Sequence, residues 1–183
     1  MLAQQIRRKF SVEEYIALFQ QNIVTGSKTE LIDGEVIELS PLGFRHAKTQ
    51  QLLQRFLASQ YCAADVYQTG SVIVDQNNML EPDVYVLRPD TRVEDNYPKA
   101  AQLLLAVEVA DSTIASDRLN DGQGKLGAYA KGSVPTVWVM DINAMSLYVF
   151  SEPKCAIYSQ CVVHTGDTEI LGKTLTIREL ITG

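Results

Sequence analysis

The 183-residue chain has few cysteines and no long apolar run. Its three cysteines, Cys62, Cys155 and Cys161, are an odd number without the paired spacing of a zinc site, so we expect free thiols in a reducing compartment. No stretch approaches the roughly 18 consecutive apolar residues that a membrane-spanning helix needs. Residues 1–9 are polar and basic and lack the apolar core of a secretory signal. The sequence therefore predicts a cytoplasmic protein that does not enter a membrane.

Positive charge is also scarce. Sixteen lysines and arginines face 22 acidic residues, which gives a formal net charge of −6 and argues against a protein that coats nucleic acid by charge alone. An enzyme that meets phosphates through a bound cation stays compatible, because the metal reverses the local field. The Gly-x-Ser-x-Gly elbow of serine hydrolases is missing, and Gly122-Gln123-Gly124-Lys125 is only a fragment of a phosphate-binding loop.

Ordinary globular composition indicates a single domain over residues 1–183, with 46% apolar and 21% charged residues. Ser11 and Glu14 form a capping-box pattern, which predicts a helix to about residue 21. Asp33-Gly34 lies between two β-like runs and predicts a hairpin over residues 30–39. Apolar residues at helical spacing then predict a helix over residues 44–61.

The rest of the chain alternates strands with one internal helix. The patterns predict strands at 65–75, 80–87, 103–109, 136–142 and 146–150, a loop at 88–100, a helix at 121–131, and a tail with one or two strands and a helix at 177–181. This order predicts an α/β (α+β) fold, a mixed sheet flanked by helices with an N-terminal helix and hairpin.

Glu108 is the most informative single residue, because it lies inside the apolar run Leu103–Ala110. Such a run is typical of a strand buried on both faces, where a lone carboxylate is costly unless it is paired, protonated or bound to metal. Its neighbours on the same strand face, Ala106 and Ala110, are small and leave room for an ion or substrate. The alternative is a structural acid that is solvated at the strand end or paired with a cation.

Two further residues complete a possible catalytic set. Asp83 follows Pro82 at the start of a strand, and Lys125 shares a helical face with Tyr129. Each is individually a common structural residue, a turn former and a solvated charge. Together with Glu108 they match a metal-dependent nuclease, in which two carboxylates hold a hard divalent cation and a lysine stabilises developing charge.

Several segments, taken together, resemble the Uma2 family, also called DUF820, of restriction-endonuclease-like proteins in the PD-(D/E)XK nuclease superfamily. The resemblance covers most of the chain and rests on the runs Glu30-Leu31-Ile32-Asp33-Gly34-Glu35, Glu81-Pro82-Asp83-Val84, Val107-Glu108-Val109-Ala110-Asp111-Ser112 and Lys125-Leu126-Gly127-Ala128-Tyr129. No one of these runs is specific alone.

The resemblance implies a restriction-endonuclease-like fold and assigns roles to residues. Asp83 and Glu108 match the two metal ligands, for Mg²⁺ or Mn²⁺. Ala110 stands where the superfamily's strand lysine is expected, and Lys125 on the following helix matches a displaced lysine, with Arg118 as its rival.

An acid from an early segment often joins such sites, and the resemblance leaves Glu30 and Glu35 as candidates. His46 shares a helical face with Leu53 and points inward, either toward the site or as a hydrogen-bonded core histidine.

The sequence thus predicts a metal-dependent endonuclease that hydrolyses DNA by metal-activated water. The alternative is a catalytically inactive nuclease-fold protein that acts as a binding or regulatory module, which the −6 charge and Ala110 favour. Cutting both strands of a duplex usually takes two sites, so a homodimer is expected.

Overall fold

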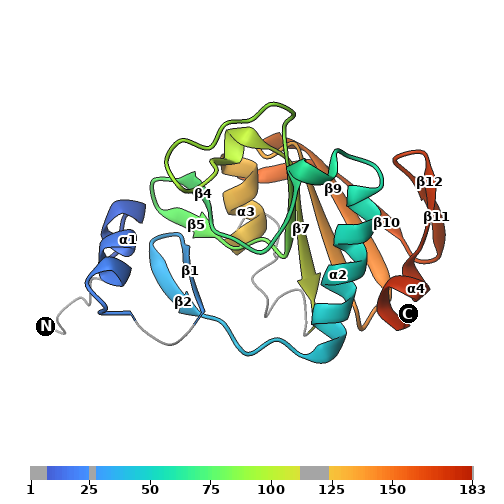
Figure 1. Cartoon of the computed structure of the whole chain (residues 1–183), viewed down its shortest axis with the longest axis horizontal. Coiled ribbons are helices and arrows are strands. Elements are labelled where there is room, and N and C mark those ends of the chain that lie inside the picture. Colours follow the sequence, from blue (N-terminus) through green and yellow to red (C-terminus); the bar gives the residue numbers. More distant parts are fainter. Residues whose placement is uncertain (1–7, 25–27, 112–123, 183) are drawn as a thin grey trace, which may run out of the picture.

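The computed structural model describes residues 8–24, 28–111 and 124–182 (Figure 1). Its helices are α1 (Val12–Gln20), α2 (Phe44–Ala58), α3 (Gly124–Lys131) and α4 (Ile177–Thr182), with 3₁₀ turns η1 (Ala63–Asp65) and η2 (Ala100–Gln102). Its strands are β1 (Thr29–Ile32), β2 (Glu35–Glu38), β3 (Val66–Gln68), β4 (Val72–Asp75), β5 (Asn78–Leu80), β6 (Val84–Leu87), β7 (Leu103–Ala110), β8 (Thr136–Asp141), β9 (Ser146–Lys154), β10 (Ile157–His164), β11 (Asp167–Ile170) and β12 (Lys173–Thr176). In the described ranges, no helix has the length and apolar character to cross a membrane.

The N-terminal helix and hairpin form where the local sequence predicts them. The Ser11 hydroxyl accepts a hydrogen bond from the Glu14 amide at 3.2 Å, and the Glu14 carboxylate accepts one from the Ser11 amide at 3.0 Å. This reciprocal capping box starts α1. Asp33 and Gly34 have φ values of 49° and 78°, the left-handed pair that a tight two-residue hairpin requires.

The main sheet has six strands in the order β10-β9-β8-β7-β6-β3. Only β7 and β8 run parallel, joined through α3, and the other neighbours are antiparallel. A smaller sheet has the order β2-β1-β5-β4, and β11 pairs with β12. The mixed α+β class predicted from the order of elements is confirmed.

Two predicted strands are each split between the two sheets. The segment 65–75 forms β3 and β4, because Thr69 and Gly70 take positive φ values of 57° and 122° between them. The segment 80–87 forms the end of β5 and then β6, and Pro82 lies between them, where it cannot donate to a ladder. These breaks let the chain cross from one sheet to the other.

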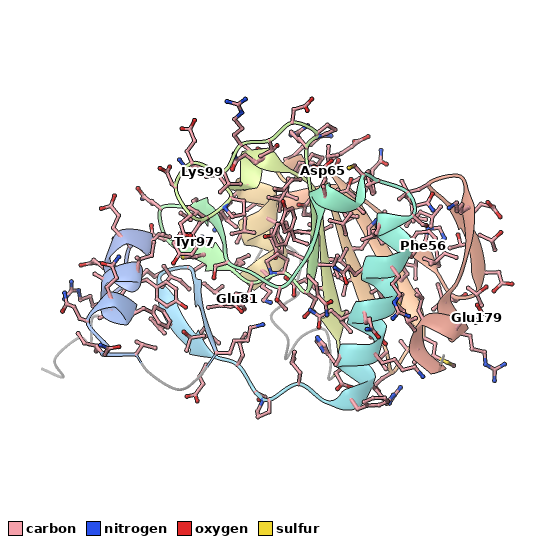
Figure 2. The ribbon with its side chains drawn as sticks, in the orientation of Figure 1. Phe56, Asp65, Glu81, Tyr97, Lys99 and Glu179 are labelled. Atoms are coloured by element: carbon pink, nitrogen blue, oxygen red, sulfur yellow. The ribbon has the colours of Figure 1, made fainter. Side chains whose placement is uncertain are left out.

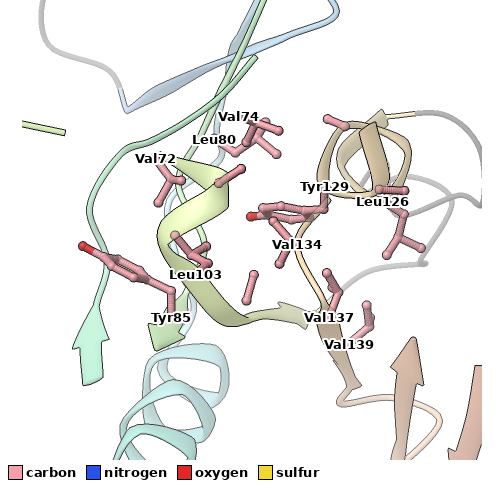
Figure 3. Packing of buried hydrophobic residues seen from close by; sticks show 14 of the residues in the cluster. Val72, Val74, Leu80, Tyr85, Leu103, Leu126, Tyr129, Val134, Val137 and Val139 are labelled. Atoms are coloured by element: carbon pink, nitrogen blue, oxygen red, sulfur yellow. The ribbon is translucent and has the colours of Figure 1, made fainter. Parts of the chain in front are cut away.

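The central strand β7 is buried on both faces, as its apolar run predicts. Leu105, Val107 and Val109 lie in the apolar cluster that contains residues of α2 and α4. Ala106 and Ala110 lie in the cluster that contains residues of α3 and the smaller sheet. Figure 3 shows the second cluster, in which the Tyr129 ring from α3 packs among aliphatic side chains. The two faces of β7 thus carry two separate cores.

The C-terminal third differs from the expected pattern at one strand. β10 was not predicted, because most of its side chains are exposed and it lacks a buried alternation. It nevertheless pairs with β9 from Ile157 to His164 and closes one edge of the main sheet. The tail then forms β11, β12 and α4, as predicted, and α4 packs against α2.

Candidate active site

A cleft of about 400 Å³ opens where the two sheets meet. Figure 1 shows the hairpin β1–β2 on one side, α2 on the other, and the segment between β2 and α2 joining them. Figure 2 shows Glu81 between that hairpin and α2. The segment between β5 and β6, the end of β7 and the start of α3 complete the lining. The lining residues are Lys28, Glu30, Ile32, Ile37, Glu38, Leu39, Ser40, Pro41, Leu42, Gly43, His46, Glu81, Asp83, Glu108, Val109, Asp111 and Lys125.

Asp83 is fixed where the ladder between β6 and β7 ends. The last paired residues are Val84 and Val107, and beyond them the Val109 amide donates to Asp83 Oδ2 at 2.7 Å. The Val109 amide is thus satisfied by the Asp83 side chain in place of a carbonyl from the neighbouring strand. The sequence pattern Pro-Asp therefore places a buried carboxylate beside the end of β7.

Glu108 projects from the α3 face of β7. Its Oε2 accepts a hydrogen bond from Lys125 Nζ at 2.9 Å, and its Oε1 accepts one from the Tyr129 hydroxyl at 2.7 Å. Both donors come from α3, one turn apart, as their helical spacing predicts. The room left by Ala106 and Ala110 is therefore occupied by side chains of α3.

Glu30 closes the buried charge cluster from β1. Its Oε1 lies 2.8 Å from Lys125 Nζ and accepts a hydrogen bond from the Glu81 amide at 2.7 Å. The side chain is fully buried, and Oε2 has no hydrogen-bond partner among the described residues. Glu35, the other early candidate, pairs with Ile32 nearer the turn of the hairpin and is not among the lining residues.

Burial governs the ionisation of this cluster. Desolvation raises the pKa of Glu108 to about 7. The negative charges of Asp83 and Glu30 act in the same direction, and the positive charge of Lys125 opposes them. Burial alone would lower the pKa of Lys125, but Glu108 and Glu30 outweigh it and raise that pKa, so the lysine stays an ammonium. Burial and Glu108 raise the pKa of Tyr129 well above its ordinary value and keep its hydroxyl a donor.

The first two turns of α2 clamp Asp83 from the opposite side. His46 Nε2 lies 2.9 Å from Asp83 Oδ1, and Gln50 Nε2 donates to the Asp83 carbonyl at 2.7 Å. Burial works to lower the pKa of His46, but the hydrogen bond and charge of Asp83 raise it overall. His46 thus satisfies both sequence interpretations, since it is a buried hydrogen-bonded histidine that lines the cleft. Sequence reasoning missed Gln50, because a polar residue on a mostly polar helix gives no signal of its own.

The structure therefore brings together Asp83, Glu108, Lys125, Glu30 and His46 in one cleft. Arg118, the alternative cation, lies outside the described residues.

The donor set suits a hard divalent cation. Asp83 and Glu108 are carboxylates whose oxygens each keep a lone pair beside the hydrogen bond they accept. The unpartnered Oε2 of Glu30 is a further buried carboxylate oxygen from the lining of the same cleft. In the described ranges, no group of three or more His, Cys, Asp or Glu side chains is clustered as a metal cage. Mg²⁺ rarely needs one, because it keeps waters and binds through one or two carboxylates and substrate phosphates.

Comparisons with known proteins identify the fold and the family of this chain. A search of solved structures finds a crystal structure described as "a putative nuclease belonging to DUF820 from Anabaena variabilis ATCC 29413", with a TM-score of 0.66 and 14% identity over 94% of this chain and 98% of that one. At this identity the likeness shows a shared fold. The search of curated proteins found no match. The model of the Uma2 family, described as "Putative restriction endonuclease", matches residues 12–180, and with nearly its whole length covered this chain belongs to the Uma2 family.

Proposed function

We propose that this protein is a Mg²⁺- or Mn²⁺-dependent endonuclease that hydrolyses DNA phosphodiester bonds. The observation that carries the proposal is the convergence of Asp83 and Glu108 on one cleft, with Lys125 Nζ 2.9 Å from Glu108. Membership of the Uma2 family and the shared fold of the Anabaena protein support a nuclease.

Asp83 and Glu108 would hold the cation, and Glu30 is placed to join them. The bound cation would lower the pKa of a water ligand and neutralise charge on the phosphate. Water attacks phosphorus and gives up a proton to solvent, the bond from phosphorus to the leaving oxygen breaks, and that oxygen takes up a proton from solvent. Lys125 would stabilise negative charge that develops near phosphorus, and Tyr129 and His46 would hold Glu108 and Asp83 in place.

The charge of the cleft supports the proposed need for a cation. Six acids line it, and only two lysines oppose them among the described residues, so it repels a phosphate until positive charge is added. This resolves the apparent conflict between the net charge of −6 and a polyanionic substrate.

Two further features belong to the proposal. We place the protein in the cytoplasm, because Cys62 and Cys155 are exposed free thiols. We propose a homodimer for cutting both strands of a duplex, which light scattering would test by molecular mass.

The decisive experiment incubates supercoiled plasmid with the purified protein and Mg²⁺ or Mn²⁺. Wild type should nick or linearise the plasmid, Glu108→Ala and Asp83→Ala should not, and Glu179→Ala, an exposed acid on α4, should behave as wild type. Calorimetry with Mn²⁺ should show binding that only the two cleft variants lose. Metal binding without cleavage would favour an inactive nuclease fold, and equal metal binding in all four proteins would refute the site.

A further inference from the structure

Two exposed apolar side chains form a rim where the mouth of the cleft meets the start of α2. Phe44, the first residue of α2, is 82% exposed, and Leu42, which lines the cleft, is 48% exposed. Single exposed apolar side chains are ordinary, but neighbouring ones beside a cleft are typical of a binding surface. Leu42 belongs to the segment between β2 and α2, whose course Figure 1 shows, and Phe44 begins the helix two residues later.

The outward face of α2 continues from this rim with positive charge. Phe44, Lys48, Gln51 and Arg55 follow one another at steps of four, three and four residues, so they share one helical face. The opposite face is the buried one, with His46, Leu53 and Leu57. Arg45 lies beside the stripe, and α2 contains no acidic residue, in a chain where acids outnumber bases.

An aromatic platform followed by spaced cations is the combination that binds a single nucleic-acid strand. Bases stack on exposed aromatic rings, and the cations follow the phosphate backbone. From Phe44 to Arg55 the helix rises about 16 Å, which is enough for several nucleotides. A paired duplex hides the faces of its bases and would leave Phe44 without a stacking partner.

We infer that Phe44 and the outward face of α2 dock an unpaired nucleic-acid strand and lead it into the cleft. A base stacks on Phe44 beside Leu42, and phosphates follow Lys48 and Arg55. The inference rests on the proposed function for the reaction in the cleft, and it adds that the DNA strand must be unpaired where it enters the cleft, so that a duplex is cut where it opens locally.

Fluorescence anisotropy with labelled DNA tests this docking face, with Ca²⁺ as the cation so that binding is measured without turnover. Wild type should bind a single-stranded oligonucleotide more tightly than a duplex of the same sequence. Phe44→Ala should weaken single-strand binding by about 5- to 150-fold, the range for a lost base–aromatic stack. Ile23→Ala, which removes an apolar side chain that is 62% exposed after α1, should change nothing.

Charge is tested separately with Lys48→Gln/Arg55→Gln. The slope of log affinity against log salt for the single strand should fall by about 1.4, at roughly 0.7 per lost phosphate contact. The control Lys99→Gln/Lys154→Gln removes the same charge from exposed lysines outside α2 and should leave the slope unchanged. Thermal melting should show that all variants are folded.

The outcomes separate this inference from the proposed function. Tighter duplex binding, or Phe44 and α2 variants that match their controls while Mn²⁺-dependent cleavage is normal, would overturn the docking face alone. Single-strand binding that needs Phe44 but is never followed by cleavage in Mn²⁺ would support the docking face and refute the nuclease. Absence of both binding and cleavage would overturn both.

Discussion

Replacing Lys125 by methionine is expected to lower the free energy of unfolding of the metal-free protein by roughly 3–5 kcal/mol at pH 8. The lysine ammonium lies 2.8 Å from Glu30 Oε1 and 2.9 Å from Glu108 Oε2, and all three residues are buried. Methionine keeps much of the side-chain volume but leaves two carboxylates without their cation. Removing one partner of a buried ion pair costs about this much, because the remaining charge is uncompensated.

The loss should depend on pH, because Glu108 can take up a proton. Its pKa is raised from 4.5 to about 7 with Lys125 present, and removal of the ammonium raises it further. A carboxyl whose pKa is higher in the folded state loses stability as pH rises from the unfolded value through the folded one. The wild type should therefore level off above pH 7, whereas Lys125→Met continues to lose up to about 1.4 kcal/mol per pH unit.

Urea denaturation with a chelator at pH 6, 7 and 8 measures this difference. Lys131→Met is the matched control on the same helix, because its partly exposed pair with Asp33 at 3.1 Å should contribute under about 1 kcal/mol. The double variant Lys125→Met/Glu108→Gln should recover much of the loss, since it removes one uncompensated charge. A loss below about 1 kcal/mol at pH 8, or the same loss at pH 6 and pH 8, would refute the buried charge cluster.

Three further predictions follow from the same site. Mn²⁺ affinity measured by calorimetry should rise about tenfold per pH unit up to roughly pH 7 and then stay constant, because Glu108 must lose its proton to bind the cation. A constant affinity from pH 5.5 to 8 would contradict this. At saturating Mn²⁺, Lys125→Ala should slow single-turnover cleavage about 10²- to 10³-fold, and Lys125→Arg should rescue it poorly. Full activity of Lys125→Ala would remove the catalytic role of the lysine. The raised pKa of His46 contributes stability that is fully present below pH 6.5 and is lost as pH rises through the pKa of the folded state. His46→Gln should therefore flatten this part of the stability profile measured with urea, and an unchanged profile would contradict the pairing with Asp83.

Features that depend on neighbours in sequence were predictable. The capping box of Ser11 and Glu14, the Asp33-Gly34 turn and the buried strand around Glu108 all form as predicted, because each rests on local hydrogen bonds or on a short apolar period. The predicted strand boundaries were wrong where a local break redirects the chain. Thr69-Gly70 and Pro82 send successive residues to different sheets, which an apolar pattern read along one strand does not reveal.

The candidate site depended more heavily on distant contacts. The sequence by itself determined that Asp83 and Glu108 are acids near apolar strands and that Lys125 lies on the next helix. It could not rank Glu30 against Glu35, since both belong to one hairpin, and only the packing of β1 beside α3 puts Glu30 Oε1 against Lys125. Such contacts join residues up to about a hundred positions apart, and they arise when whole elements bury their apolar faces against one another. The sequence thus determined which chemical groups the protein has, and the tertiary structure alone decided which of them form the buried ion pairs around Lys125.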